Sequence, residues 1–282
     1  MKRVTAILLA AVALIAGAVF VLRPASTPES PRRSGGGPSP ETTSAPAPPP
    51  LALPAPAPVG SPPPAGGDAT KTCLVLGTVR LAAPPPRRKP IPMDADPACA
   101  ALHSAPMLSE AIVTGADFGL RWAFVYVRKG ALPVASPSHP VLLVQDGCRY
   151  EPHVLGIQVG QLLLIRNNDS LLHNIHALPF SNKEFNFGQP SKGMEEARQF
   201  ITQEIMVKVK CDVHPWMSAW IGVLEHPYFA VTDAAGAYSL PELPAGRYEL
   251  EVWHETYRSV SRTIDLRPGD RVEANFQLDA RK

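Results

Sequence analysis

The sequence predicts an all-β protein whose folded part is preceded by an N-terminal membrane helix and a disordered, proline-rich linker. Two patterns predict the β class. Apolar and polar side chains alternate from Ile205 to Cys211, which is the period of a half-buried strand. From Ala230 to Val252, short alternating segments are separated by turns that contain Gly and Pro. A third pattern, an apolar run followed by a stretch rich in Pro, Ala, Ser and Gly, sets the N-terminal quarter apart.

Residues 1–23 are predicted to be an N-terminal transmembrane anchor or a signal peptide. Val4 to Leu22 is an almost unbroken apolar run after two basic residues, and as a helix it would be roughly 28 Å long, close to the thickness of a bilayer core. We favour an uncleaved anchor, because the run is long for a signal peptide and Arg23-Pro24 follows without a clear cleavage site. Either alternative exports the remainder, so we expect a periplasmic or other extracytoplasmic protein, anchored to the inner (cytoplasmic) membrane.

Residues 24–70 are predicted to be a disordered linker, because this composition buries too little apolar surface to fold. The charge of the chain also belongs largely to its N-terminus. Five of the 27 basic and two of the 25 acidic residues lie in the first 67, which leaves the rest with a net charge of −1. A nucleic-acid partner is therefore not expected.

The most informative motif is the run from Cys211 to Met217, which reads Cys-Asp-Val-His-Pro-Trp-Met. It places a thiolate, the His214 imidazole and a thioether close enough in sequence for one loop to direct all three at a single point. Soft sulfur together with imidazole selects copper, and one Cys, two His and a weak axial Met form the blue-copper electron-transfer set. The motif therefore requires a second histidine from elsewhere in the chain.

The second histidine is expected at the turn after the strand-like segment from Gln161 to Arg166. His173 and His176 both occur there, and in an extended segment they face opposite sides, so only one of them is expected to be a ligand. We predict His173, with His176 as the alternative. Cys211 is expected on the inward face at the end of its strand, in the dry surroundings that tune a copper site.

With these motifs, residues 141–226 resemble a cupredoxin, and within that family the amicyanin and plastocyanin type. The resemblance rests on the short Cys-x2-His-x2-Met loop with Pro215 after its histidine, and on Asn168 followed by the run His173-Asn-Ile-His176. It implies a Greek-key β-sandwich with one type 1 copper. The ligands that it implies are His173, Cys211, His214 and Met217, with Asn174 as a neighbour that steadies the thiolate.

The C-terminal segment, residues 227–282, resembles the carboxypeptidase regulatory-like domain, a small transthyretin-like β-sandwich. It carries no zinc signature, so no hydrolytic activity is implied. The segment is short for a whole sandwich. We therefore expect residues 71–140, which contain strand-like stretches at 74–81 and 121–127, to supply the missing strands, with the cupredoxin inserted into or packed on this second sandwich. His226 and His254 are expected to form structural hydrogen bonds.

Three cysteines remain once Cys211 is assigned to the metal. In an oxidising compartment, Cys99 and Cys148 are the preferred disulfide, because both lie in the folded region before the copper segment. A second metal site from these two cysteines with His103 and His153 is the alternative. Cys73 has no assigned role.

These features predict a copper-binding electron carrier that cycles between Cu(II) and Cu(I), rather than an enzyme. Its partners would be exported redox proteins such as a c-type cytochrome or a dehydrogenase. If the loop brings His214 to the surface, electrons would leave through its imidazole edge, with Pro215 and Trp216 as a docking patch; core packing is the alternative for Trp216.

Three other functions are alternatives to an electron carrier. A copper storage or delivery protein would share the ligands, but no Met-rich or His-rich tract is present. An oxidase or nitrite reductase fragment would need a second copper centre with several more histidines at motif spacing, which the eight histidines of this chain do not supply. A binding module with structural copper would not undergo reversible reduction.

Overall fold

The computed structural model describes residues 72–279, which belong to one compact unit. The predicted membrane helix (1–23) and the predicted linker (24–70) lie outside the described residues. Within residues 72–279, no helix has the length and apolar character needed to cross a membrane. This part of the chain is nearly all β, as the sequence predicts; its helices are α1 (Pro97–Ala101) and the 3-10 turn η2 (Ala116–Phe118).

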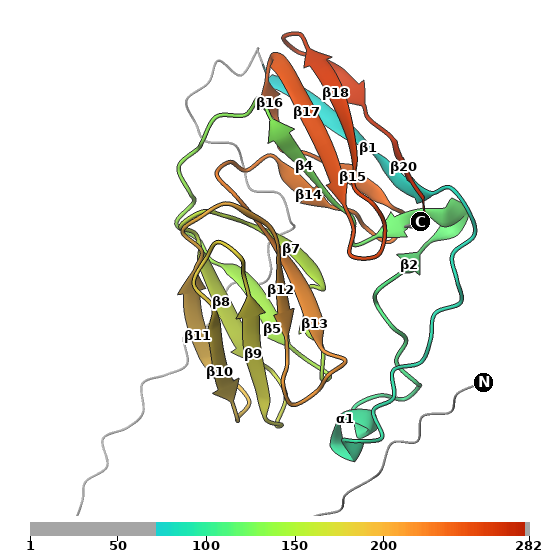
Figure 1. Ribbon diagram of the computed structural model, residues 1–282, viewed down its shortest axis with the longest axis vertical. Coiled ribbons are helices and arrows are strands. Elements are labelled where there is room, and N and C mark those ends of the chain that lie inside the picture. Colours follow the sequence, from blue (N-terminus) through green and yellow to red (C-terminus); the bar gives the residue numbers. More distant parts are fainter. Residues whose placement is uncertain (1–71, 280–282) are drawn as a thin grey trace, which may run out of the picture. The chain divides into compact units, whose positions relative to one another are not determined.

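The strands between residues 141 and 224 pair with one another and form a two-sheet body (Figure 1). They are β5 (Val141–Gln145), β6 (Tyr150–Glu151), β7 (Val154–Gln158), β8 (Leu162–Asn167), β9 (His173–Leu178), β10 (Phe185–Gln189), β11 (Glu195–Gln199), β12 (Glu204–Lys210) and β13 (Ser218–Leu224). One sheet has the order β10-β9-β12-β13-β7 and the other β11-β8-β5-β6. We call this body the first sandwich.

The core of the first sandwich lies between its two sheets. Its fully buried side chains include Leu143 and Ile165 of one sheet and Ile175, Val209 and Ile221 of the other. Alternation along β12 places Val207 and Val209 inside and Lys208 outside, as the sequence indicates, although a register shift between Glu204 and Val207 also buries Met206. This alternation directs the end of β12, and therefore Cys211, toward the core.

The strands on either side of the first sandwich in sequence form a second one. Its strands are β1 (Thr72–Leu81), β4 (Phe124–Lys129), β14 (Phe229–Val231), β15 (Ala237–Ser239), β16 (Leu243–Pro244), β17 (Gly246–Trp253), β18 (Val260–Leu266), β19 (Arg271–Glu273) and β20 (Phe276–Leu278). β1 pairs with β15, β16, β19 and β20, and the order of the other sheet is β14-β4-β17-β18. Strands from both ends of the chain thus share one core, because Val75 and Val125 are buried in the same cluster as Leu250 and Ile264.

A pair of glycines lies where the two sandwiches touch. Gly156 of β7 and Gly222 of β13 are directly paired in the register. A Cβ atom at Gly222 would come within 2.5 Å of Phe124 Cζ, and one at Gly156 within 2.2 Å of Phe229 Cε2. The missing side chains therefore make room for two aromatic rings of the second sandwich.

The connection from β1 to β4 is long and carries the short pair β2 (Val113–Thr114) and β3 (Leu120–Arg121). It also carries α1, which lies between β1 and β2 in the chain and which Figure 1 shows at the bottom, away from β1. Asp96 caps α1 by accepting the backbone N–H groups of Ala98 and Cys99 at 3.0 and 3.3 Å. Cys99 of α1 forms a disulfide with Cys148, in the turn between β5 and β6. A distant part of the chain is thereby fixed to one end of the first sandwich.

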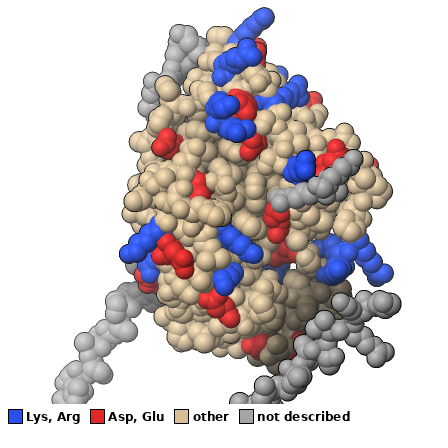
Figure 2. All heavy atoms as spheres, in the orientation of Figure 1, with Lys and Arg blue, Asp and Glu red and all other residues tan. Residues whose placement is uncertain are grey.

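Charged side chains are distributed without a dominant sign. On the face in Figure 2, Lys and Arg side chains are interspersed with Asp and Glu side chains and do not gather into one basic area.

Candidate metal centre

The strand ends of one sheet bring the four predicted ligands together. His173 is the first residue of β9, and the loop from Cys211 to Met217 joins the end of β12 to the start of β13. β12 pairs with both strands, with Lys210 opposite His176 on one side and opposite Ser218 on the other. The Cys-x2-His-x2-Met loop and the upstream histidine therefore meet where these strands end, on one side of the sheet.

Backbone hydrogen bonds fold the loop back on itself. The Cys211 N–H donates to the Met217 carbonyl at 3.2 Å, and the Met217 N–H donates to the His214 carbonyl at 3.0 Å. The His214 N–H points to Cys211 Sγ at 3.4 Å. Asn174 ties the loop to β9, because its side-chain oxygen accepts the Asp212 N–H at 2.6 Å.

Three donor atoms converge inside this loop. Nδ1 of His173 and Nδ1 of His214 lie 3.0 Å apart, and Cys211 Sγ lies 3.7 Å from Nδ1 of His214. The three ligand atoms lie within 4.8 Å of one another, and all three residues are buried. Met217 is also buried, at 1% exposure, in the same core cluster.

The outer nitrogen of each imidazole faces a carboxylate. His173 Nε2 lies 2.8 Å from Asp169 Oδ2, and His214 Nε2 lies 3.0 Å from Asp96 Oδ2. An ionised carboxylate only accepts, so each Nε2 carries a proton, and in the neutral ring Nδ1 then has a bare lone pair. Two such lone pairs would repel at 3.0 Å unless a cation, either a proton or a metal ion, lies between them and the thiolate.

The donor set fits copper. Ligating histidines commonly donate their other N–H to a carboxylate, which fixes the tautomer and the ring orientation. A thiolate with two imidazoles and a nearby thioether is the soft and borderline set that copper prefers. His173, Cys211, His214 and Met217 are therefore the residues that would hold it.

The metal-free site is already arranged for charged ligands. Burial alone lowers the pKa of His173, but its hydrogen bond to Asp169 and the nearby Cys211 raise it to about 9. Burial raises the pKa of the Cys211 thiol, but hydrogen bonds from His173 and from backbone N–H groups outweigh this and lower it to about 7. The thiol of Cys211 therefore ionises near neutral pH. In the metal-free protein, a proton on His173 takes the place of the metal ion.

The pKa values of both carboxyl groups lie below the usual range. For Asp169, burial works against ionisation, but the hydrogen bonds from His173 and from the N–H groups of Gly147 and Cys148 prevail. For Asp96, the hydrogen bond from His214 is the main cause. Both groups therefore stay ionised and keep accepting from the two imidazoles.

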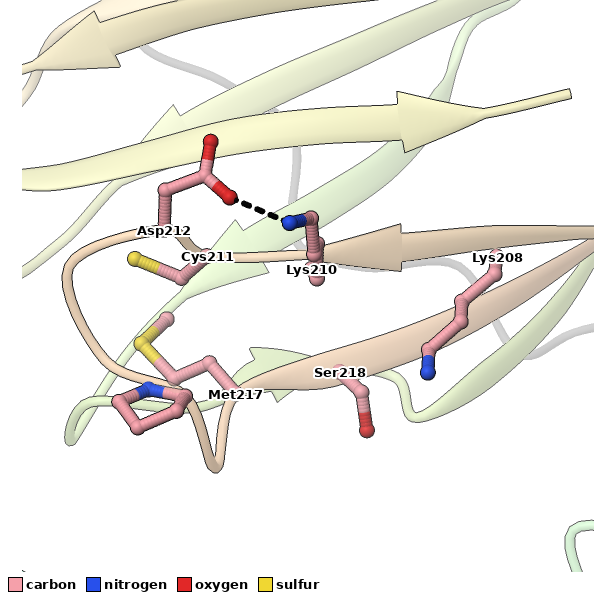
Figure 3. Close-up of a pocket in the computed structure, with 7 residues that line it drawn as sticks. Lys208, Lys210, Cys211, Asp212, Met217 and Ser218 are labelled. Atoms are coloured by element: carbon pink, nitrogen blue, oxygen red, sulfur yellow. Dashed lines mark ion pairs between the residues drawn. The ribbon is translucent and has the colours of Figure 1, made fainter. Parts of the chain in front are cut away.

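One pocket, of about 280 Å³, reaches both predicted sulfur ligands, Cys211 and Met217. Figure 3 shows its lining, with Cys211 and Met217 beside polar residues of β12 and β13. Its lining residues are Lys208, Lys210, Cys211, Asp212, Pro215, Met217 and Ser218. Lys210 Nζ lies 2.7 Å from an oxygen of Asp212, the ion pair drawn in Figure 3.

The expectation that the imidazole of His214 reaches the surface is wrong. The residue is only 1% exposed, because Asp96 and the Cys99 sulfur, which lies 3.5 Å from Nε2, cover its outer edge. Pro215 is exposed, as a docking patch requires. Trp216 is half-buried: it packs on the core of the first sandwich and donates its indole N–H to the Cys148 carbonyl at 3.1 Å.

The other histidines and cysteines have different surroundings. His176 faces away from the predicted ligands; its Nδ1 lies 3.0 Å from Asp212 Oδ2 and its Nε2 lies 2.8 Å from Glu184 Oε1. His226 Nε2 lies 3.0 Å from the Val127 carbonyl, and His254 Nδ1 accepts the Thr256 N–H at 3.1 Å. These are structural hydrogen bonds.

Neither sulfur of the Cys99–Cys148 disulfide is a free thiolate for a second metal site. Of the two histidines in that alternative, His103 Nε2 lies 2.9 Å from the Gly147 carbonyl and His153 Nε2 lies 2.6 Å from Glu255 Oε1. Cys73 is buried and free, and its thiol points to the Arg267 carbonyl at 2.9 Å.

Sequence reasoning missed the two carboxylates. Asp169 lies four residues before His173 in the same turn, and this proximity was a usable signal. Asp96 lies 118 residues before His214, and no local pattern connects them. Its role depends on the path of the connection between β1 and β2.

Comparison with known proteins gives two independent likenesses. A family model of the carboxypeptidase regulatory-like domain matches residues 221–279, which begins within β13 and confirms the resemblance of the C-terminal segment. Solved structures with similarity to this chain include cupredoxins and a copper-containing nitrite reductase. No curated protein sequence matches the chain.

Three solved structures illustrate the second likeness. A purple cupredoxin from Nitrosopumilus maritimus is 26% identical and aligns over 29% of this chain and 97% of its own, with a TM-score of 0.25. An amicyanin variant in the Cu(I) form is 18% identical over 35% of this chain and 97% of its own, with a TM-score of 0.27. A copper-containing nitrite reductase from Thermus scotoductus SA-01 is 23% identical over 34% of this chain, with a TM-score of 0.27, and the match spans about a quarter (26%) of that enzyme's length.

Proposed function

We propose that this protein is a copper-binding electron-transfer protein with one type 1 site, held by His173, Cys211, His214 and Met217 in a Greek-key cupredoxin domain at residues 141–226. The observation that carries the proposal is the convergence of two carboxylate-anchored imidazoles, whose Nδ1 atoms lie 3.0 Å apart, on a buried thiolate. Copper bound there would accept and release one electron between Cu(II) and Cu(I).

The residues of this chain would make that exchange fast by keeping the ligands in place. Asp169 and Asp96 fix the imidazoles, backbone N–H groups hold the Cys211 sulfur, and Asn174 anchors the loop to β9. A site that does not rearrange between two oxidation states adds little reorganisation to electron transfer, whereas a flexible loop would add much. Burial in the core of the first sandwich also limits the access of water to the ligands.

We further propose that the carrier works outside the cytoplasm, tethered to the inner membrane by residues 1–23, with an exported c-type cytochrome or dehydrogenase as its partner. The support is the N-terminal sequence pattern together with the disulfide between Cys99 and Cys148, which is typical of oxidising compartments. In this proposal residues 71–140 and 227–282 form the second sandwich around the inserted cupredoxin.

Voltammetry of the purified, copper-loaded full-length protein tests the electron-transfer function. We expect a reversible one-electron wave at a defined potential and fast electron self-exchange. A protein that instead passes Cu(I) readily to a chelating acceptor and exchanges electrons slowly would be a copper storage or delivery protein, and the proposal would be wrong.

A further inference from the structure

The outer edge of His214 is closed to any partner. Its Nε2 edge contacts Asp96 Oδ2 at 3.0 Å and Cys99 Sγ at 3.5 Å. We call residues 96–101, which comprise Asp96 and α1, the α1 cap. The disulfide to Cys148 fastens this cap to the turn between β5 and β6, so the covering is part of the folded structure. An electron leaving through the histidine edge would have to cross the cap.

The pocket in Figure 3 offers another approach to the site. Its lining comes from β12, the loop and the start of β13, and it includes both sulfur ligands. The thiolate is the ligand with the strongest covalent coupling to copper, so a partner at this pocket would be separated from the metal by a single ligand side chain. A second pocket touches Met217 and Trp216 but does not reach Cys211.

The rim of the first pocket carries a positive charge. Lys208 and Lys210 project from the same face of β12 because side chains alternate along a strand. Asp212 neutralises Lys210. Lys208 has no carboxylate partner among the described residues, and its ammonium lies 5.6 Å from the Trp220 ring. Apart from Cys211 itself, the lining side chains therefore total one net positive charge.

We propose that electrons enter and leave through this pocket, and that it receives an acidic surface of an exported one-electron redox protein. This rests on the proposed function. One electron passes from the reduced site to the partner or in the reverse direction, and no bond forms or breaks. The α1 cap excludes the histidine edge, and Lys208 supplies the attraction for a carboxylate of the partner.

Thiol labelling of the metal-free protein tests the pocket without copper. Two methanethiosulfonate reagents of opposite charge, the anionic sulfonatoethyl and the cationic trimethylammonioethyl form, would compete for Cys211. We expect Lys208→Glu to lower the ratio of anionic to cationic labelling rates about tenfold at low salt, since a change of two charges acts on both reagents in opposite directions. Lys208→Gln should give about half of this effect on a logarithmic scale.

Lys183→Glu is the matched control, because this exposed lysine follows the far end of β9 from His173. Its ratio should equal that of the unchanged protein. Equal ratios for the Lys208 and Lys183 variants would overturn the proposal. So would a Cys211 that neither reagent labels until Cys99 and Cys148 are both replaced by Ser, because access would then run through the cap.

The copper-loaded protein supplies the second measurement. Oxidation of the reduced protein by anionic ferricyanide should slow in Lys208→Glu, and oxidation by a cationic cobalt(III) phenanthroline complex should accelerate. A blue, redox-active protein whose rates ignore Lys208 would refute the docking surface and leave the proposed function intact. A colourless copper protein with charge-dependent labelling would refute the proposed function instead.

Discussion

Replacing Asp96 by Asn removes the charge that holds His214 while changing few atoms. In the native side chain, Oδ1 caps α1 and Oδ2 accepts from His214 Nε2. Asparagine is as good a helix cap as aspartate, so α1 should remain folded. With the single amide oxygen on the cap, however, the amide N–H2 of the variant would face the N–H of the imidazole, donor against donor. His214 then gains stability by moving its proton to Nδ1, which blocks the ligand nitrogen.

The expected cost is about tenfold in copper affinity. Outer partners of metal-ligating histidines are typically worth about 10 to 100-fold, or about 1.4 to 2.7 kcal/mol. The Asp96 side chain is 32% exposed, so solvent screens part of its interaction and the lower end applies. The ordinary difference between a charged and a neutral hydrogen bond, about 1 kcal/mol or somewhat more, agrees with this value.

Two assays measure the effect. Competition against a chromophoric Cu(I) chelator gives the affinity, and nitrogen NMR of the metal-free protein gives the tautomer of His214. Asp94→Asn is the control, because it removes the same charge from an exposed side chain two residues away. Affinities within about twofold of each other for the two variants, with an unchanged His214 tautomer, would refute the role given to Asp96.

Four further outcomes are expected. Copper binding should release about two protons at pH 6 and about one at pH 8, because Cys211 loses its proton near pH 7 and His173 only near pH 9. Titrations in weak buffer measure this release, and a release that does not change with pH would contradict these pKa values. The pKa of Glu204 is lowered, because hydrogen bonds from the N–H groups of Phe180, Ser181 and Asn182 outweigh the burial that opposes ionisation. The ionised carboxylate therefore stabilises the folded protein above the unfolded pKa of 4.5, and this stabilisation is lost as the pH falls through the lowered pKa. Glu204→Gln should therefore cost stability at pH 7 and show a flatter acid limb in urea unfolding, and parallel curves would argue against it. Gly222→Ala should destabilise the protein by about 1–3 kcal/mol through the clash with Phe124, whereas Gly188→Ala, whose Cβ would meet nothing closer than 3.7 Å, should be close to neutral in the same denaturation assay. Replacing both Cys99 and Cys148 by Ser removes a disulfide between residues 49 apart and should lower the free energy of unfolding by up to about 4 kcal/mol. A variant as stable as the oxidised protein would show that the disulfide does not contribute to stability.

Local patterns in the sequence were sufficient for the β class and for the inward placement of the candidate ligand residues. Alternation along Ile205–Lys210 predicts a strand that turns Cys211 inward, and the short loop then fixes where His214 and Met217 lie. His173 follows from its place at the start of a strand, since the opposite face of β9 carries His176. Each of these predictions depends on residues that are near in sequence, so local patterns were enough to make them.

Features that depend on distant segments were beyond the sequence. The burial of His214 results from a short helix more than a hundred residues upstream, whose position is set by a disulfide and by Asp96. Its sequence, Pro-Ala-Cys-Ala-Ala, gives no sign that it covers His214. The contact of Gly156 and Gly222 with two aromatic rings was likewise not predictable, because a glycine in a strand does not reveal which side chain will pack against it.

The visible absorption spectrum of the Cu(II)-loaded protein, taken beside that of Cys211→Ala, decides whether the site is a type 1 copper centre. A type 1 site gives an intense blue colour from thiolate-to-copper charge transfer, which is lost in the variant while the protein stays folded. A native protein that binds Cu(II) without this band, or a Cys211→Ala variant that keeps it, would contradict the assignment of Cys211, His173, His214 and Met217 as a type 1 copper site.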